Sequence, residues 1–129
     1  MNKRILILAS ILGLTSVIIG AFGAHGLKEV LDAEQLQTFE VGVRYQMYHA
    51  LFLLFIGLTQ KISVKTKSTI FYLVLVGVIF FSASIYGLAT NDLTGFDFKK
   101  IALITPIGGA LLIASWAILL INFLKLKKN

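Results

Sequence analysis

The sequence predicts an all-α integral membrane protein, a four-helix up-and-down bundle that forms one domain over residues 1–129. Three observations lead to this prediction. Hydrophobic residues fill 57% of the positions and charged residues only 14%, against about a quarter in soluble proteins. The mean hydropathy is +0.88. The charges also lie between long apolar runs. A soluble domain of this size could not bury so many apolar side chains, so we expect the lipid bilayer to cover them.

Uncharged runs mark the expected spans at residues 5–24, 45–60, 68–91 and 101–124. A helix rises about 1.5 Å per residue, so crossing about 30 Å of hydrocarbon takes roughly 20 residues. The run 45–60 is too short, and its helix must bring charged residues to the membrane boundary. We therefore expect approximate spans at 5–24, 41–60, 68–90 and 101–124.

The first span, 5–24, has small residues at every third or fourth position, which places them on one helix face and permits close packing. The alternative is a cleaved signal peptide, because Lys3 and Arg4 precede the run and the small residues of 21–24 resemble a cleavage site. A discarded segment would need no packing face, so we favour a retained helix. The predicted packing residues are Ala9, Gly13, Ser16, Gly20 and Ala24.

The helix of the second span is expected to begin outside the membrane. Asp32 is a favourable N-cap and apolar residues recur after it at helical spacing, so we predict a helix that begins near Ala33 and runs unbroken through 41–60. Glu40 and Arg44 stand one turn apart at the outer boundary, where pairing would lower the cost of leaving water. Either this pair anchors the helix, or it forms an anion or proton site at the mouth of the bundle.

His49 lies deeper in the same span, where a neutral imidazole needs a partner inside the protein. Counting inward from the outer ends places Ser84, Tyr86 and Thr105 at a similar depth, so we expect His49 to bind one of them within a polar layer. The layer either fixes helix register or forms a titrating or ligand-binding site. The candidate polar residues are His25, Glu40, Arg44, Tyr45, Gln46, His49, Ser84, Tyr86 and Thr105.

The fourth span opens with Pro106 and the glycines Gly108 and Gly109. Proline near a helix start removes one donor and can bend the helix, while paired glycines admit another backbone, so we expect a packing or hinge element and favour packing. Trp116 is too far from either end for the interfacial aromatic belts, and we expect it in the core or facing lipid. The preceding segment, 91–100, is typical of a short external turn.

The distribution of charge predicts the orientation. Alternate connections carry eight basic residues and no acid on one side, and four basic residues with all 6 acids on the other. Because basic residues collect on the cytoplasmic side, we expect both termini in the cytoplasm. The net charge of +6 then indicates topology and phospholipid contact, with no nucleic-acid partner. The eight basic residues are Lys3, Arg4, Lys61, Lys65, Lys67, Lys125, Lys127 and Lys128.

Catalytic and cofactor chemistry find little support in the sequence. The chain has no cysteine, which excludes disulfides and thiolate chemistry, and His25 and His49 alone are too few for a metal site. No nucleophile, base and orienting group stand at a recognisable spacing. We therefore expect no cofactor, no metal and no enzymatic activity.

Four segments carry a family resemblance: 20–27 (GAFGAHGL), 43–51 (VRYQMYHAL), 82–86 (SASIY) and 104–109 (ITPIGG). In this order, and over nearly the whole chain, the sequence resembles the bacterial YgdD/YwdK-like family, domain of unknown function 423. The resemblance implies a small multi-spanning inner-membrane protein. It supplies no chemistry and no catalytic residue.

Two functional interpretations remain from the sequence. The first is an interaction or assembly role, as a homo-oligomer or an accessory subunit of a larger complex in the bacterial cytoplasmic membrane, because spans with glycine faces offer packing surface. The alternative is a pocket or pathway for a small ligand or ion, built on Glu40, Arg44 and His49. A copurifying protein would favour the first, and a bound non-protein molecule or proton-coupled uptake the second.

Overall fold

The computed structural model describes residues 1–127, and this part of the chain contains helices and no strand. Four helical segments are long and apolar enough to cross a membrane, which confirms the predicted fold class. They are α1 (Asn2–His25), α2 (Ala33–Leu58), a third segment formed by α3 (Val64–Val78), η2 (Ile79–Ala83) and α4 (Ser84–Ala89), and α5 (Ile104–Leu124). Short 3₁₀ turns, η1 (Leu27–Glu29), η3 (Asn91–Leu93) and η4 (Phe98–Ile101), lie in the connections. Lys128, one of the eight basic residues, and Asn129 lie outside the described residues.

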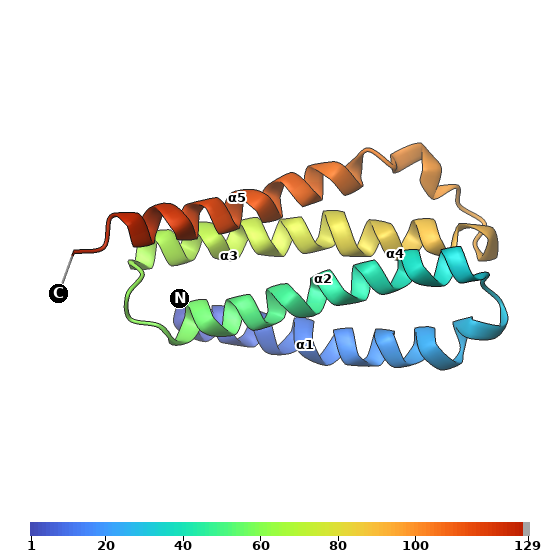
Figure 1. The fold of residues 1–129 in the computed structure, drawn as a ribbon, viewed down its shortest axis with the longest axis horizontal. Helices are drawn as coiled ribbons and strands as arrows, with labels where there is room; N and C mark the ends of the chain where they lie inside the picture. Colours follow the sequence, from blue (N-terminus) through green and yellow to red (C-terminus); the bar gives the residue numbers. More distant parts are fainter. Residues whose placement is uncertain (128–129) are drawn as a thin grey trace.

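The long helices alternate in direction (Figure 1). The N-terminus, the connection 59–63 and the end of α5 lie at one end of the molecule, called here the terminal end. The connections 26–32 and 90–103 lie at the opposite end. An even number of crossings therefore returns the chain to the side on which it began.

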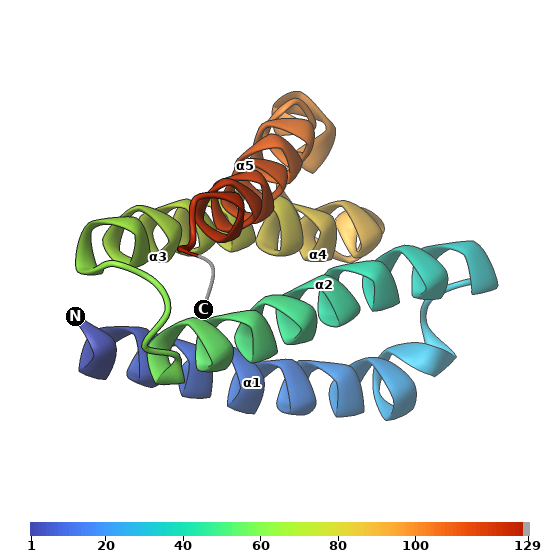
Figure 2. The ribbon, with the colours of Figure 1, turned by 60° about the vertical axis from the view of Figure 1, so that its left-hand side comes forward.

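The helices form two hairpins that meet through α2 and the α3–η2–α4 segment. α1 packs mainly on α2, while α5 packs mainly on α3 and η2. Consequently α1 and α5 lie on opposite sides of the molecule (Figure 2). α5 runs alongside α3 and diverges from α4 towards its own start (Figure 1).

Local capping explains where the helices begin. The Asp32 side chain accepts a hydrogen bond from the Gln35 backbone N–H, and the Gln35 side chain accepts one from the Asp32 N–H, which satisfies two donors at the start of α2. The helix then runs without a break to Leu58, as the sequence predicted. Ser63 caps α3 in the same way by accepting from the Thr66 backbone N–H, so this helix begins at Val64.

The third segment is not a regular α-helix. Its five residues Ile79–Ala83 form a π turn between α3 and α4, a feature that the sequence did not predict. Gly108 of α5 packs directly on this turn, where a Cβ at position 108 would overlap the backbone around Phe80 and Phe81. On the opposite side, the Ser82 hydroxyl donates to the carbonyl of Gly42 in α2 at 2.8 Å. The π turn is thus held from both sides by backbone contacts.

Two apolar clusters form the core. The larger one joins all four segments in the half near the terminal end and includes Ile5, Leu53, Ile56, Ile70 and Val74, each fully buried. The smaller one lies towards the opposite end around Leu27, Leu31, Phe39 and Ala89. Between them, in α1, α2 and the third segment, lie the buried polar side chains of Ser16, Gln46, His49, Ser82 and Ser84.

Candidate functional site

Gln46 of α2 joins three helices through its side-chain amide. Its Nε2 donates to the Leu12 carbonyl at 3.0 Å and to the Thr15 hydroxyl oxygen at 2.7 Å, both in α1. Its Oε1 accepts a hydrogen bond from the Tyr86 hydroxyl of α4 at 2.6 Å. Both amide protons and the carbonyl oxygen are therefore used, and the Gln46 side chain is only 4% exposed.

Serine hydroxyls make further contacts between helices in the same region. Ser16 of α1 donates to the Val43 carbonyl of α2 at 3.0 Å. Ser84 and Thr105 bring α4 and α5 together, with their hydroxyl oxygens 2.6 Å apart. These bonds join α1 to α2 and α4 to α5 within the apolar interior of the bundle.

His49 faces the interior, as predicted, but it binds none of the three expected partners. Its Nδ1 lies 2.7 Å from the Tyr45 carbonyl, and its Nε2 lies 3.1 Å from the indole Nε1 of Trp116 in α5. Because an indole N–H only donates, Nε2 must accept, and Nδ1 must carry the proton that it donates to Tyr45. The bonding geometry therefore selects the neutral Nδ1–H tautomer.

The predicted polar layer is therefore two separate groups. Tyr86 meets Gln46, and Ser84 meets Thr105, but neither pair reaches His49. The imidazole instead lies one turn deeper, beside Phe52 and Trp116. Trp116 was not among the expected partners, because the comparison of depths along the helices covered only Ser84, Tyr86 and Thr105.

A groove of about 300 Å³ lies between α2 and α5, with Phe81 of the π turn also lining it. We call it the α2–α5 groove. Its other walls are His49 and Tyr45 on one side and Gly109, Leu112, Ile113 and Trp116 on the other. Trp116 stacks on Phe52 with ring centroids 4.2 Å apart, and Tyr45 packs on Phe81 at 5.2 Å. The lining is almost entirely apolar and aromatic, which suits a hydrocarbon ligand and not an ion.

Glu40 and Arg44 line a second groove of about 300 Å³, between α1 and α2. Both side chains are exposed, and within residues 1–127 no pair of their charged atoms comes within 4.0 Å. The structure therefore does not contain the ion pair that we expected between Glu40 and Arg44. An exposed pair gains little from direct contact, because solvent already stabilises each charge and fixing two long side chains costs entropy.

The small residues of α1 face α2. Ala9 and Ser16 are buried, while a Cβ at Gly13 would lie 3.8 Å from Ala50 and one at Gly20 would lie 3.2 Å from Val43. Ala24 is exposed, and Gly23 takes the corresponding place against Phe39. Seven residues complete almost two helical turns from Ser16, whereas eight overshoot, which explains why position 23 continues the face and position 24 leaves it.

His25, the last residue of α1, is exposed and does not join the polar groups around Gln46. Among residues 1–127, no three histidine or acidic side chains gather in a way that could hold a metal ion.

Lys67 is a buried residue that sequence reasoning treated only as a loop charge. Its side chain is 4% exposed, and its Nζ donates to the Thr59 carbonyl at 2.6 Å and to the Asn2 side-chain oxygen at 2.9 Å. Thr59 is the C-cap of α2, where the helix dipole favours a cation. The ammonium group therefore ties the start of α3 to the end of α2 and the start of α1. The only feature of the sequence that could have indicated its burial is its position in the first turn of a helix capped by Ser63.

The comparisons with known proteins agree with these observations. The model of the family described as "Protein of unknown function (DUF423)" matches residues 19–109. A UPF0382 membrane protein of Staphylococcus saprophyticus is 39% identical over 124 residues, which cover 96% of this chain and 99% of the relative. The UPF0382 membrane protein YwdK of Bacillus subtilis is 36% identical, covering 95% and 98%. The UPF0382 inner membrane protein YgdD of Escherichia coli K12 is 34% identical, covering 99% and 95%. No solved structure matches the chain significantly.

Proposed function

Since the chain belongs to the DUF423 family of membrane proteins, in which no activity is assigned, we propose from its own geometry that it is a non-catalytic binding protein of the bacterial cytoplasmic membrane. In this proposal the chain forms one four-span domain with both termini in the cytoplasm. The α2–α5 groove receives an apolar chain, acyl or prenyl in character, that enters sideways from the bilayer.

One observation carries this proposal: an apolar and aromatic groove of about 300 Å³ opens beside a histidine whose protonation is fixed by Trp116 and Tyr45. Ligand sites are typically apolar hollows with a few positioned polar groups. The Tyr45 side chain, which is 41% exposed, supplies a phenol at the groove margin. An apolar chain that ends in one hydrogen-bonding group fits this combination.

The remaining polar side chains support a structural role for the layer around Gln46. In residues 1–127 every buried side-chain nitrogen or oxygen has a hydrogen-bond partner. A proton or ion pathway would require polar groups that face water or one another along a continuous route, whereas these groups are occupied by their neighbours. The layer therefore holds the helices in the positions that shape the groove.

An assembly role is the second candidate, and the aromatic surface beside the groove favours it. Tyr48 is 50% exposed and packs edge-on against Tyr45, and Trp116 is 48% exposed. Aromatic side chains of this kind are enriched at protein interfaces. The glycine faces that first suggested assembly give less support, because Gly13, Gly20 and Gly108 contact the protein's own helices.

Native mass spectrometry after extraction in mild detergent tests the two candidates. We expect the wild-type protein to retain one small apolar molecule, and Gly109→Leu, which fills the groove, to lose it. Ala117→Leu adds the same side chain at an exposed position of α5 outside the groove and should retain the ligand. Equal retention by Gly109→Leu, or no retained molecule in the wild type, would disprove the groove proposal. A retained second polypeptide would support assembly instead.

A further inference from the structure

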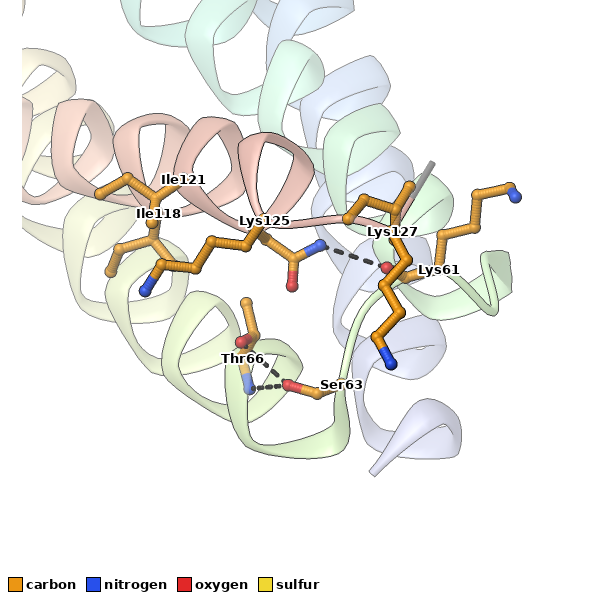
Figure 3. Close-up of a pocket in the computed structure, with 9 residues that line it drawn as sticks. Lys61, Ser63, Thr66, Ile118, Ile121, Lys125 and Lys127 are labelled. Carbon is orange, nitrogen blue, oxygen red and sulfur yellow. Dashed lines mark hydrogen bonds between the residues drawn. The ribbon is translucent and has the colours of Figure 1, made fainter. Parts of the chain in front are cut away.

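A basic depression lies at the terminal end of the bundle, far from the α2–α5 groove. It has a volume of about 700 Å³ and lies between the end of α5, the connection 59–63 and the start of α3 (Figure 3). Three lysines line it, together with hydroxyl and amide groups, and no acidic residue does. We call it the terminal basic depression. Its residues are Lys61, Ser63, Thr66, Ile118, Ile121, Asn122, Lys125, Leu126 and Lys127.

The side chains flank the depression unequally. In the view of Figure 3, Lys127 extends towards Ser63, whereas Lys125 runs back along α5 past Ile118. Lys61 points away, and its carbonyl instead accepts a hydrogen bond from the Asn122 side chain at 3.2 Å, which closes one wall (Figure 3). Lys125 and Lys127 are thus the ammonium groups placed to meet a ligand in the depression.

Within residues 1–127, no acidic side chain compensates the charge of this depression. All six acidic residues lie at the opposite end of the molecule or in the helix that leads from it, between Glu29 and Asp97. None of them faces Lys125 or Lys127 across the depression. Ser63 and Thr66 add hydroxyls at the start of α3, where the helix dipole also favours negative charge. The missing partner is therefore an anion that accepts several hydrogen bonds.

The depth of the depression indicates where that anion comes from. α5 has 21 residues and spans about 31 Å, close to the thickness of the hydrocarbon layer, so its end at Leu124 reaches the headgroup level. Ile118 and Ile121 line the depression on the side towards the membrane interior. The same cavity thus offers the Lys127 ammonium group near headgroup depth, while the Lys125 side chain runs back along the apolar wall (Figure 3).

We propose that the terminal basic depression binds the phosphate of an anionic phospholipid, with Lys125 and Lys127 as the charged ligands and Ile118 and Ile121 against the upper acyl chain. The phosphodiester accepts hydrogen bonds from the ammonium groups and from the Thr66 hydroxyl, since the Ser63 hydroxyl already donates to Thr66 at 3.0 Å. This site is independent of the groove proposed above, since the two share no residue. It does not depend on which side of the membrane carries the termini.

The test compares lipid binding by two double variants of the full chain. Purified protein in detergent is titrated with dioleoyl phosphatidylglycerol or with dioleoyl phosphatidylcholine, and bound lipid is counted by native mass spectrometry. We expect phosphatidylglycerol to be preferred, and Lys125→Gln with Lys127→Gln to weaken its binding on the order of 30-fold, about fivefold for each lysine. Lys99→Gln with Lys100→Gln removes the same charge at the opposite end and should bind as the wild type does.

Each other outcome overturns the proposal. Equal weakening in both double variants would mean that overall charge alone attracts the lipid, and equal binding of the two lipids would exclude phosphate charge as the determinant. Inorganic phosphate that protects the wild type from heat unfolding as well as phosphatidylglycerol does would identify a free-anion site. Both double variants change only exposed side chains, so circular dichroism should be that of the wild type.

Discussion

At the scale of single residues, hydrogen-bond chemistry decides which polar groups can meet. Gln46 offers two donors and one acceptor, and it uses them on Leu12, Thr15 and Tyr86. The sequence predicted that Gln46 and Tyr86 belong to the polar set, because amide and phenol groups in a membrane span need partners. It could not predict which groups pair, since partner choice depends on the rotation and tilt of each helix.

Lys67 allows a sharp residue-scale prediction. Lys67→Met keeps the length of the side chain but leaves the Thr59 carbonyl and the Asn2 side chain without their donor. We expect the free energy of unfolding to fall by about 1–3 kcal/mol, the range usual for losing a hydrogen bond to a charged group. Unfolding followed by circular dichroism in mixed detergent micelles measures this. Lys65→Met, at an exposed position two residues away, serves as the control. An equal loss in both variants would contradict a stabilising role for the Lys67 hydrogen bonds to Thr59 and Asn2.

At the scale of helices, the sequence predicted the start of α2 but not the π turn in the third segment. The start of α2 follows from Asp32 and the residues next to it, so local sequence suffices. The π turn at Ile79–Ala83 has no comparable local signature, because it is held by Gly108 from α5 and by the Ser82 contact with α2. Each membrane-spanning helix also carries apolar residues on all its faces, so hydropathy alone could not predict which face of α5 points towards the other helices.

The adjacent glycines Gly108 and Gly109 allow a test of which position requires the absence of a Cβ, because only Gly108 packs directly against backbone atoms. Gly108→Ala places a methyl group into the backbone of the π turn, which cannot yield as a side-chain tip could. Gly109→Ala meets the Phe81 ring at 3.5 Å, an ordinary van der Waals distance. We expect the first variant to lose about 1–3 kcal/mol of unfolding free energy and the second to change little.

The same micelle unfolding assay compares the two variants, and each carries one added methyl group in the same helix. Helix propensity favours alanine equally at both sites, so it cancels in the comparison. If the two variants unfold at the same denaturant fraction, the close approach of α5 to the π turn is not what holds this part of the bundle.

At the scale of the whole molecule, the number of spans and the side of each connection determine which groups meet the cytoplasm. The basic residues of the terminal end predict a cytoplasmic location for both termini. The chain has no cysteine, so single cysteines can report the location directly. We expect Lys65→Cys to resist a membrane-impermeant maleimide in intact cells and Asp92→Cys to react.

Both variants should react once the cells are permeabilised, which controls for accessibility, and both positions are exposed in the structure. Labelling of residue 65 in intact cells, with protection of residue 92, would reverse the orientation. Labelling of both in intact cells would contradict the crossing of the membrane by the α3–η2–α4 segment, which separates the two positions.

The two-hairpin arrangement also sets an order of events during synthesis. α1 and α2 bury small residues against each other and need no later segment to do so, whereas α3 can meet α5 only after synthesis has passed Ile104, where α5 begins. The first hairpin can therefore fold in the bilayer while the second is still being translated. Lys67 then follows as the first residue of the second hairpin to bind the first one, through Thr59 and Asn2. The Lys67 ammonium group, which joins the two hairpins in the folded protein, can therefore form these bonds before α5 has been synthesised.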